Sequence, residues 1–134
     1  MGGTFPTNYI NIGQLSKLKY TYLFGFKKPD LKDFSGCKEL RKLWIYSVDI
    51  ENLGGLSDLA NLVQLDLENA RKPVSLDGID SGNLHLQTVH LSNCRKLRNA
   101  DALANLPSLE QLRLYQIHEL NSLNFLRFLN KLEN

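Results

Sequence analysis

The sequence predicts an α/β solenoid, in which short repeats stack so that their strands form one parallel sheet. Three observations favour this fold class: a leucine spacing that recurs, a nearly constant distance between its copies, and a change of apolar rhythm inside each copy. The spacing Leu-x-x-Leu-x-Leu begins at Leu40, Leu62, Leu86 and Leu109, with a degenerate copy at Leu18. The first leucines of the copies are 22, 22, 24 and 23 residues apart. Self-similarity at such a period is the signature of a repeat architecture.

The first half of each copy is predicted to be a strand. Apolar residues at its fourth and sixth positions alternate with other residues, as in the pairs Leu43/Ile45 and Leu65/Leu67. Because successive side chains of a strand point to opposite faces, each pair points to the same buried face. Stacked copies therefore place these strands side by side.

The second half of each copy has a rhythm of three. In one run the apolar residues are Cys94, Leu97, Ala100, Leu103, Leu106, Leu109 and Leu112. An α-helix would not keep this run on one face, whereas 3₁₀ turns have three residues each. We expect short 3₁₀ pieces, broken at Gly54-Gly55 or Pro107, and a thin convex side. The two cysteines, Cys37 and Cys94, are expected to be buried and reduced.

The two ends of the chain are predicted to differ from the repeats between them. Residues 1–17 are expected to form an N-terminal cap or an edge strand, with the alternating stretch Tyr9–Ile12 as the strand. Residues 18–134 are expected to hold five repeats and a truncated sixth repeat or a C-terminal cap, because Leu132 is in phase to begin another copy. The apolar cluster before it consists of Phe125, Leu126, Phe128 and Leu129. Three interpretations of this cluster are open. Its residues fold over the last repeat as a cap, the chain is a fragment, or a partner covers this end.

The third return segment is longer than its neighbours. Pro73, Gly78 and Gly82 indicate turns there. We interpret the segment as a local bulge, with a loop that touches a partner as the alternative.

The pattern resembles that of the leucine-rich repeat family, with the consensus Leu-x-x-Leu-x-Leu-x-x-Asn/Cys-x-Leu. The resemblance covers about residues 18–132, and the short return segments are most similar to the bacterial and phosphatase-regulator classes. It implies a right-handed superhelix with a concave parallel β-sheet and a convex side of short 3₁₀ or irregular turns. The ninth position departs from the consensus and holds Phe26, Val48, Ala70, Cys94 and Ile117. We expect packing to replace the buried amide ladder that the family builds there.

The resemblance places the residues beside the buried leucines on the concave face. The residues predicted to bind a partner there are Tyr20, Tyr22, Phe24, Lys42, Trp44, Tyr46, Asp66, Glu68, His90, Arg113 and Tyr115. Six of the chain's twelve aromatic residues, among them its only Trp, belong to this set. Aromatic and Arg side chains anchor many protein interfaces. The alternative is that the aromatic residues only pack against one another across the strands. The eighth position of each copy is assigned to the same face, with Gly25, Ser47, Asn69, Asn93 and Gln116.

Charge and composition argue against several classes of function. A formal net charge of +2 gives no electrostatic case for binding nucleic acid or an anionic membrane. We expect a cytoplasmic protein, because the N-terminus lacks a signal-peptide pattern and no apolar stretch is long enough to span a bilayer. No cofactor or metal is predicted, because no ligands cluster at a suitable spacing.

Enzymatic activity is also not expected. Asp66, His90 and Ser92 would be neighbours on adjacent strands, which invites comparison with a catalytic triad. His90 and Ser92 share one strand, however, and no sharp turn presents the serine as a nucleophile.

Together these observations predict a non-catalytic module that binds a protein partner on the concave face. The face is aromatic in its first two repeats and acidic at Asp66 and Glu68, which suits a partner with a basic group near its middle. One alternative is a bacterial immunity protein that neutralises a cognate toxin by occluding its active site. Another is a structural fragment of a larger leucine-rich repeat receptor or effector. The chain is expected to be a monomer or to associate through its C-terminal end.

Overall fold

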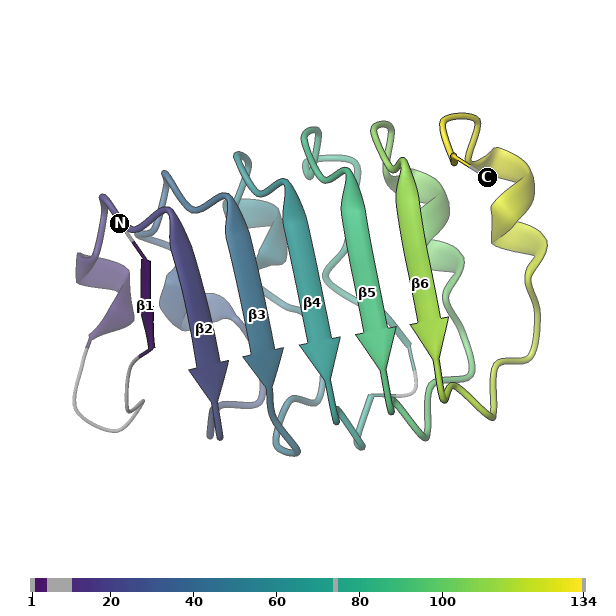
Figure 1. The fold of residues 1–134 in the computed structure, drawn as a ribbon, viewed down its shortest axis with the longest axis horizontal. Coiled ribbons are helices and arrows are strands. Elements are labelled where there is room, and N and C mark those ends of the chain that lie inside the picture. The colour runs from purple at the N-terminus through teal and green to yellow at the C-terminus, as the bar shows by residue number, and fades with distance from the viewer. Residues whose placement is uncertain (1, 5–10, 74, 134) are drawn as a thin grey trace.

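The computed structural model describes residues 2–4, 11–73 and 75–133, with side chains from residue 11 onward. Its centre is a six-stranded sheet whose strands follow one another in sequence order (Figure 1). The strands are β1 (Gly2–Thr4), β2 (Tyr20–Phe24), β3 (Lys42–Tyr46), β4 (Gln64–Glu68), β5 (Thr88–Ser92) and β6 (Gln111–Tyr115). Every neighbouring pair is parallel, so the predicted parallel sheet is confirmed.

The connections between the strands carry short 3₁₀ helices, and the described residues form no α-helix. These helices are η1 (Ile12–Gln14), η2 (Lys32–Phe34), η3 (Leu56–Asp58), η4 (Asp101–Asn105) and η5 (Asn124–Phe128). In Figure 1, η2, η3 and η4 lie behind the sheet and η5 lies beyond β6, which leaves the front of the sheet uncovered. None of the helices described here is long and apolar enough to cross a membrane.

The strands pair in the register that the leucine spacing predicts. The inward rows of the three central strands are Leu43, Leu65 and Val89, and Ile45, Leu67 and Leu91. Each of these six side chains is at most 1% exposed. Because side chains alternate along a strand, a shift by one residue would have turned all six to solvent. The recurring leucine spacing of the sequence therefore positions the core.

The three-residue rhythm of the return segments forms the opposite wall of this core. Every apolar residue of the run from Cys94 to Leu109 is buried, and η4 lies in the middle of that run. Gly55, with a φ of 95°, directly precedes η3, so the break predicted at the glycine pair is confirmed. The short 3₁₀ pieces keep one residue in three on the buried side, as their geometry requires.

Both cysteines lie in the core, as predicted. Cys37 Sγ donates to the carbonyl oxygen of Ile12 at 3.2 Å. Burial raises the pKa of the Cys37 thiol, and burial raises the pKa of Cys94 to about 11. Both residues therefore act as small apolar side chains rather than as nucleophiles at neutral pH.

The turn after each strand departs from the sequence prediction. Gly25, Asn69, Asn93 and Gln116 adopt left-handed backbone conformations, with φ between 53° and 68°. Ser47 occupies the same repeat position, yet it is only 1% exposed, and Asn69 is 5% exposed. Assigning this position to the solvent-facing side of the sheet was therefore wrong for Ser47 and Asn69. The alternation of inward and outward side chains stops where the strand finishes and the chain turns.

The ninth position of the repeat is mixed. Phe26, Ala70 and Cys94 are buried, as the packing prediction requires, whereas Val48 is 41% exposed. An amide pair does exist one position earlier, where Asn93 Nδ2 donates to Asn69 Oδ1 at 2.7 Å. The packing prediction for the ninth position thus holds at Phe26, Ala70 and Cys94 and is wrong at Val48, while the amide pair lies at the eighth position.

The N-terminal part of the prediction needs correction. Tyr9 and Ile10 lie outside the described residues, whereas Ile12 is buried in η1 and is not part of a strand. The edge strand is instead β1, whose Gly2 pairs with Tyr20 of β2. A Gly-Gly-Thr sequence has no alternation of apolar residues, so the pattern of the sequence carried no signal for it.

The long third return segment passes close to the second one. Gly78 has a φ of 113°, and a Cβ placed there would come within 2.1 Å of the Leu53 carbonyl group. Only glycine fits this approach without a backbone shift. A parallel bridge between Ser75 and Asn99 ties the segment to the fourth return.

Candidate functional site

The uncovered face of the sheet, which we call the open face, consists of the outward residues of β2 to β6. They form three rows across the strands: Tyr20, Lys42, Gln64, Thr88 and Gln111; Tyr22, Trp44, Asp66, His90 and Arg113; and Phe24, Tyr46, Glu68, Ser92 and Tyr115. All eleven residues that the sequence singled out lie in these rows. Their placement follows from the alternation that buries the leucines, because the residues between buried positions must face outward.

Aromatic side chains gather on β2 and β3. The rings of Tyr22 and Trp44 meet edge to face with centroids 4.5 Å apart, and those of Phe24 and Tyr46 stack at 4.9 Å. Such pairs stabilise neighbouring strands, as the ladder alternative expects. The cluster nevertheless remains accessible, since Phe24 is 61% exposed and Tyr20 and Trp44 are each 44% exposed. We call these five residues the aromatic patch.

Two of the predicted residues, Tyr115 and Arg113, lie apart from this patch, on β6. Tyr115 is 64% exposed on β6, with β4 and β5 between it and the aromatic patch. Arg113 is its exposed neighbour on the same strand, and Lys42 is exposed beside Tyr20. The structure therefore brings together five of the six predicted aromatic residues and separates the sixth.

A polar cluster occupies the middle of the open face. Asp66 accepts hydrogen bonds from Gln64 Nε2 and His90 Nδ1, each at 2.6 Å. Since a carboxylate only accepts, Nδ1 carries the hydrogen and Nε2 of a neutral imidazole is an acceptor. His90 Nε2 is buried and has no hydrogen-bond partner among the described residues. Asp66 is thus committed to its neighbours within the sheet.

Glu68 is the unpaired acid of this cluster. It lies between Tyr46 and Ser92 in the third row and is half-buried. Its carboxylate forms no hydrogen bond or ion pair with another described residue. A half-buried carboxylate beside aromatic rings can receive a cation at lower desolvation cost than a fully buried one.

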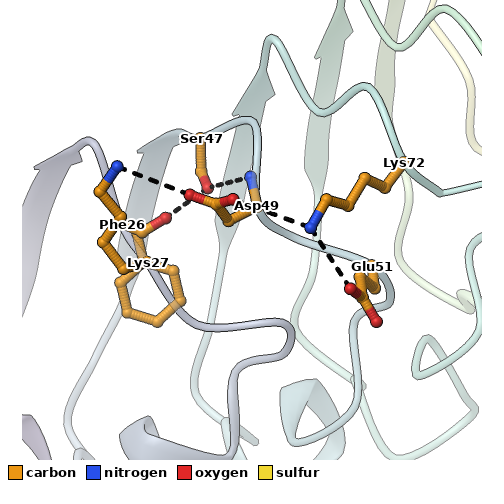
Figure 2. A network of polar contacts seen from close by, with 6 residues as sticks. All are labelled: Phe26, Lys27, Ser47, Asp49, Glu51 and Lys72. Carbon is orange, nitrogen blue, oxygen red and sulfur yellow. Dashed lines mark hydrogen bonds and ion pairs between the residues drawn. The ribbon is translucent and has the colours of Figure 1, made fainter.

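The two acids that follow β3, Asp49 and Glu51, are paired instead. Figure 2 shows Asp49 between Lys27 and Lys72, at 3.8 and 3.7 Å, and Lys72 also reaches Glu51 at 3.3 Å. These exposed ion pairs contribute little to stability. They do satisfy the acids, however, which leaves Glu68 as the carboxylate beside the aromatic patch that can receive a new partner.

Ser47 fixes the turn that carries Asp49, and sequence reasoning missed this role. Its hydroxyl donates to the Phe26 carbonyl oxygen at 2.5 Å and accepts from the Asp49 backbone N–H at 3.0 Å (Figure 2). A serine that bonds a backbone N–H two residues later forms a recognisable local turn. The Ser47-Val48-Asp49 sequence was therefore the available signal.

Ser92 lies in the third row of the open face, next to the polar cluster. His90 and Ser92 are two residues apart on β5, and no hydrogen bond joins Ser92 Oγ to His90 in the described part of the chain. Nor do the described residues include a group of three or more His, Cys, Asp or Glu side chains that could hold a metal ion. What the open face offers is apolar ring surface beside one unpaired carboxylate.

No protein-family model matches the chain, and no curated protein matches its sequence. The residues of the open face and their surroundings are therefore what indicate a function.

Proposed function

We propose that the chain is a leucine-rich repeat protein, a right-handed superhelix whose concave side is the open face, and that it binds a protein partner there without catalysis. The five repeats support this class. Each combines a five-residue strand with a thin return segment, and the strands pair in one constant register. Fold alone does not define function, so the proposal depends on the chemistry of the open face.

The observation that carries the proposal is the exposure of the aromatic patch. Phe24 and Trp44 already pack against neighbours, yet they keep 61% and 44% of their surface in contact with solvent. Sheet pairing therefore uses only part of their apolar area. Aromatic side chains that are pre-ordered by neighbours lose little entropy on binding, which makes them effective anchors.

The partner should present a basic side chain next to an apolar surface. Glu68 provides the charge for that contact, and the rings of Tyr46 and Trp44 provide a surface on which a cation can lie. Asp66 already accepts hydrogen bonds from Gln64 and His90. We therefore expect it to orient these two side chains and not to contact the partner's basic group. A basic groove, such as the substrate-binding groove of a toxin, would meet these requirements, in keeping with the immunity-protein alternative.

The test compares three tagged baits in lysate from the source organism. The wild-type chain should recover one stoichiometric protein, and the Trp44→Ala/Tyr46→Ala variant should lose it while keeping its circular dichroism spectrum. The matched control is Val48→Ala/Leu84→Ala, which truncates two exposed apolar residues outside the open face. This control should recover the protein as the wild type does.

Two outcomes would contradict the proposal. Equal recovery by the wild type and the Trp44→Ala/Tyr46→Ala variant would move the interface away from the open face. Unfolding of that variant would indicate that the aromatic patch serves only to stabilise the sheet.

A further inference from the structure

Two arginines follow β4 and β5 at the same position of neighbouring repeats. Arg71 comes two residues after Asn69, and Arg95 comes two residues after Asn93, where the chain turns through left-handed backbone. Both arginine side chains are exposed, and neither forms an ion pair within the described residues. Neighbouring repeats lie about 5 Å apart where their strands pair, and like charges held close together repel each other. The pair therefore lacks the counter-charge that a bound anion would provide.

A chain of hydrogen bonds fixes both guanidinium groups. Arg71 Nε donates to Asn69 Oδ1 and Arg95 Nε donates to Asn93 Oδ1, each at 2.9 Å. Asn93 Nδ2 joins the two by donating to Asn69 Oδ1 at 2.7 Å. Asn69 is only 5% exposed, so the sheet holds its amide group in place. Both arginines are thus ordered before a ligand arrives, which lowers the entropy cost of binding one.

The free ends of the two guanidinium groups determine the chemistry of the ligand. Nε of each arginine is already bonded, whereas Nη1 and Nη2 make no hydrogen bond with the rest of the described chain. A guanidinium group binds two oxygen atoms of one anion through parallel N–H donors. A carboxylate has two oxygen atoms and satisfies one such group, whereas a phosphoryl group has three and can contact both. Arg71 and Arg95 together therefore suit a phosphoryl group.

Acidic residues limit this basic site on the side of β3. Asp49 is the equivalent of Arg71 in the preceding repeat, and it is held by Lys27 and Lys72 at 3.8 and 3.7 Å (Figure 2). Glu68, the last residue of β4, points to the open face and pairs with no cation among the residues described. Neither acid neutralises Arg71, so its charge stays available to a ligand.

The basic residues are equally limited on the side of β6. Lys96, next to Arg95, is exposed and unpaired in the described part of the chain. The next repeat has His118 at the position of Arg95, followed by Glu119, which accepts from Arg98 Nε at 2.9 Å. A nucleic acid strand is bound along a longer basic groove that follows its series of phosphates. The short extent of the site favours a single phosphoryl group.

We propose that Arg71 and Arg95, ordered by Asn69 and Asn93, bind one phosphoryl group. A phosphorylated side chain of a protein and a free phosphate ester present the same chemistry, and the test below distinguishes them. The site follows the ends of β4 and β5, whereas the aromatic patch lies on β2 and β3. The inference therefore does not depend on partner binding at the aromatic patch.

Nuclear magnetic resonance of the ¹⁵N-labelled chain tests the proposal with two probes at constant ionic strength. One probe is sodium phosphate, and the other is a phosphoserine peptide with two glycines on each side. We expect the Nε–H resonances of Arg71 and Arg95 to shift and to saturate at about 1–10 mM phosphate. The resonance of Arg127, an exposed arginine on η5, should stay in place. Tighter binding of the peptide than of phosphate assigns the group to a protein, and equal affinity assigns it to a free ester.

Substitutions separate a specific site from general attraction between charges. Arg71→Lys keeps the positive charge but removes the planar group, so it should weaken phosphate binding about tenfold. Arg127→Lys is the matched control and should bind phosphate as the wild type does. The Trp44→Ala/Tyr46→Ala variant should also bind phosphate unchanged, whatever becomes of its protein partner.

Three results would overturn the proposal. The first is an equal shift of the Arg127 resonance, and the second is wild-type affinity of Arg71→Lys for phosphate. The third is tighter binding of a single-stranded oligonucleotide of about ten residues than of the phosphoserine peptide, which would indicate a nucleic-acid site instead.

Discussion

At the scale of single residues, Ser47 shows how a repeat can keep its core while one position changes role. Its equivalents Asn69 and Asn93 turn through left-handed backbone and bond to each other. Ser47 instead donates its hydroxyl to the Phe26 carbonyl oxygen, and the next residue, Val48, is exposed. The exchange costs little because each buried polar group still has a partner.

The buried thiol of Cys94 should make stability depend on alkaline pH. Burial raises its pKa to about 11 from an ordinary value of 9.0. The unfolded thiol ionises first as the pH rises, so the stabilisation is present below about pH 9 and is lost as the pH passes through about 11. Urea unfolding from pH 8 to 11 should show a decline steeper for the wild type than for Cys94→Ala, by up to about 2 kcal/mol. Parallel declines in the two proteins would contradict this account.

At the scale of the elements, the position of a leucine in the sheet should decide its contribution. Leu65→Ala removes a fully buried side chain from a central strand and should lower the free energy of unfolding by about 2–5 kcal/mol. Leu114→Ala is the matched control at an inward position of β6, where the side chain is half-buried, and should cost less than about 2 kcal/mol. Urea unfolding measures both values. A loss below about half a kcal/mol for Leu65→Ala would mean that the strand register is wrong.

The strands were predictable from the sequence because the same leucine spacing recurs in four copies and in a degenerate fifth, at a nearly constant period. Period two assigned Trp44 and Asp66 to the outward rows, and the structure pairs them across β3 and β4. The turns were not predictable in the same way. Gly, Asn and Gln all adopt the left-handed conformation at the position after a strand, so no single residue type marks it. The pairing of side chains could not be predicted from the sequence either. The register makes Asp66 and His90 neighbours, but their hydrogen bond of 2.6 Å depends on the rotamers of both side chains.

At the scale of the whole molecule, the outward aromatic residues divide between the two ends of the sheet. The aromatic patch belongs to β2 and β3, whereas Tyr115 belongs to β6, with β4 and β5 between them (Figure 1). In a stack of repeats each repeat contacts only its neighbours, so the two groups do not touch. The proposed interface is therefore centred on one end of the sheet.

The central claim is that the aromatic patch contacts a protein partner, and site-specific photo-cross-linking tests it most directly. A benzophenone amino acid replaces Phe24, which is 61% exposed, and in a control replaces Phe128, which is 65% exposed on η5. After irradiation in lysate from the source organism, we predict one major adduct from position 24 and none of the same mass shift from position 128. An adduct from position 128 alone would contradict the claim.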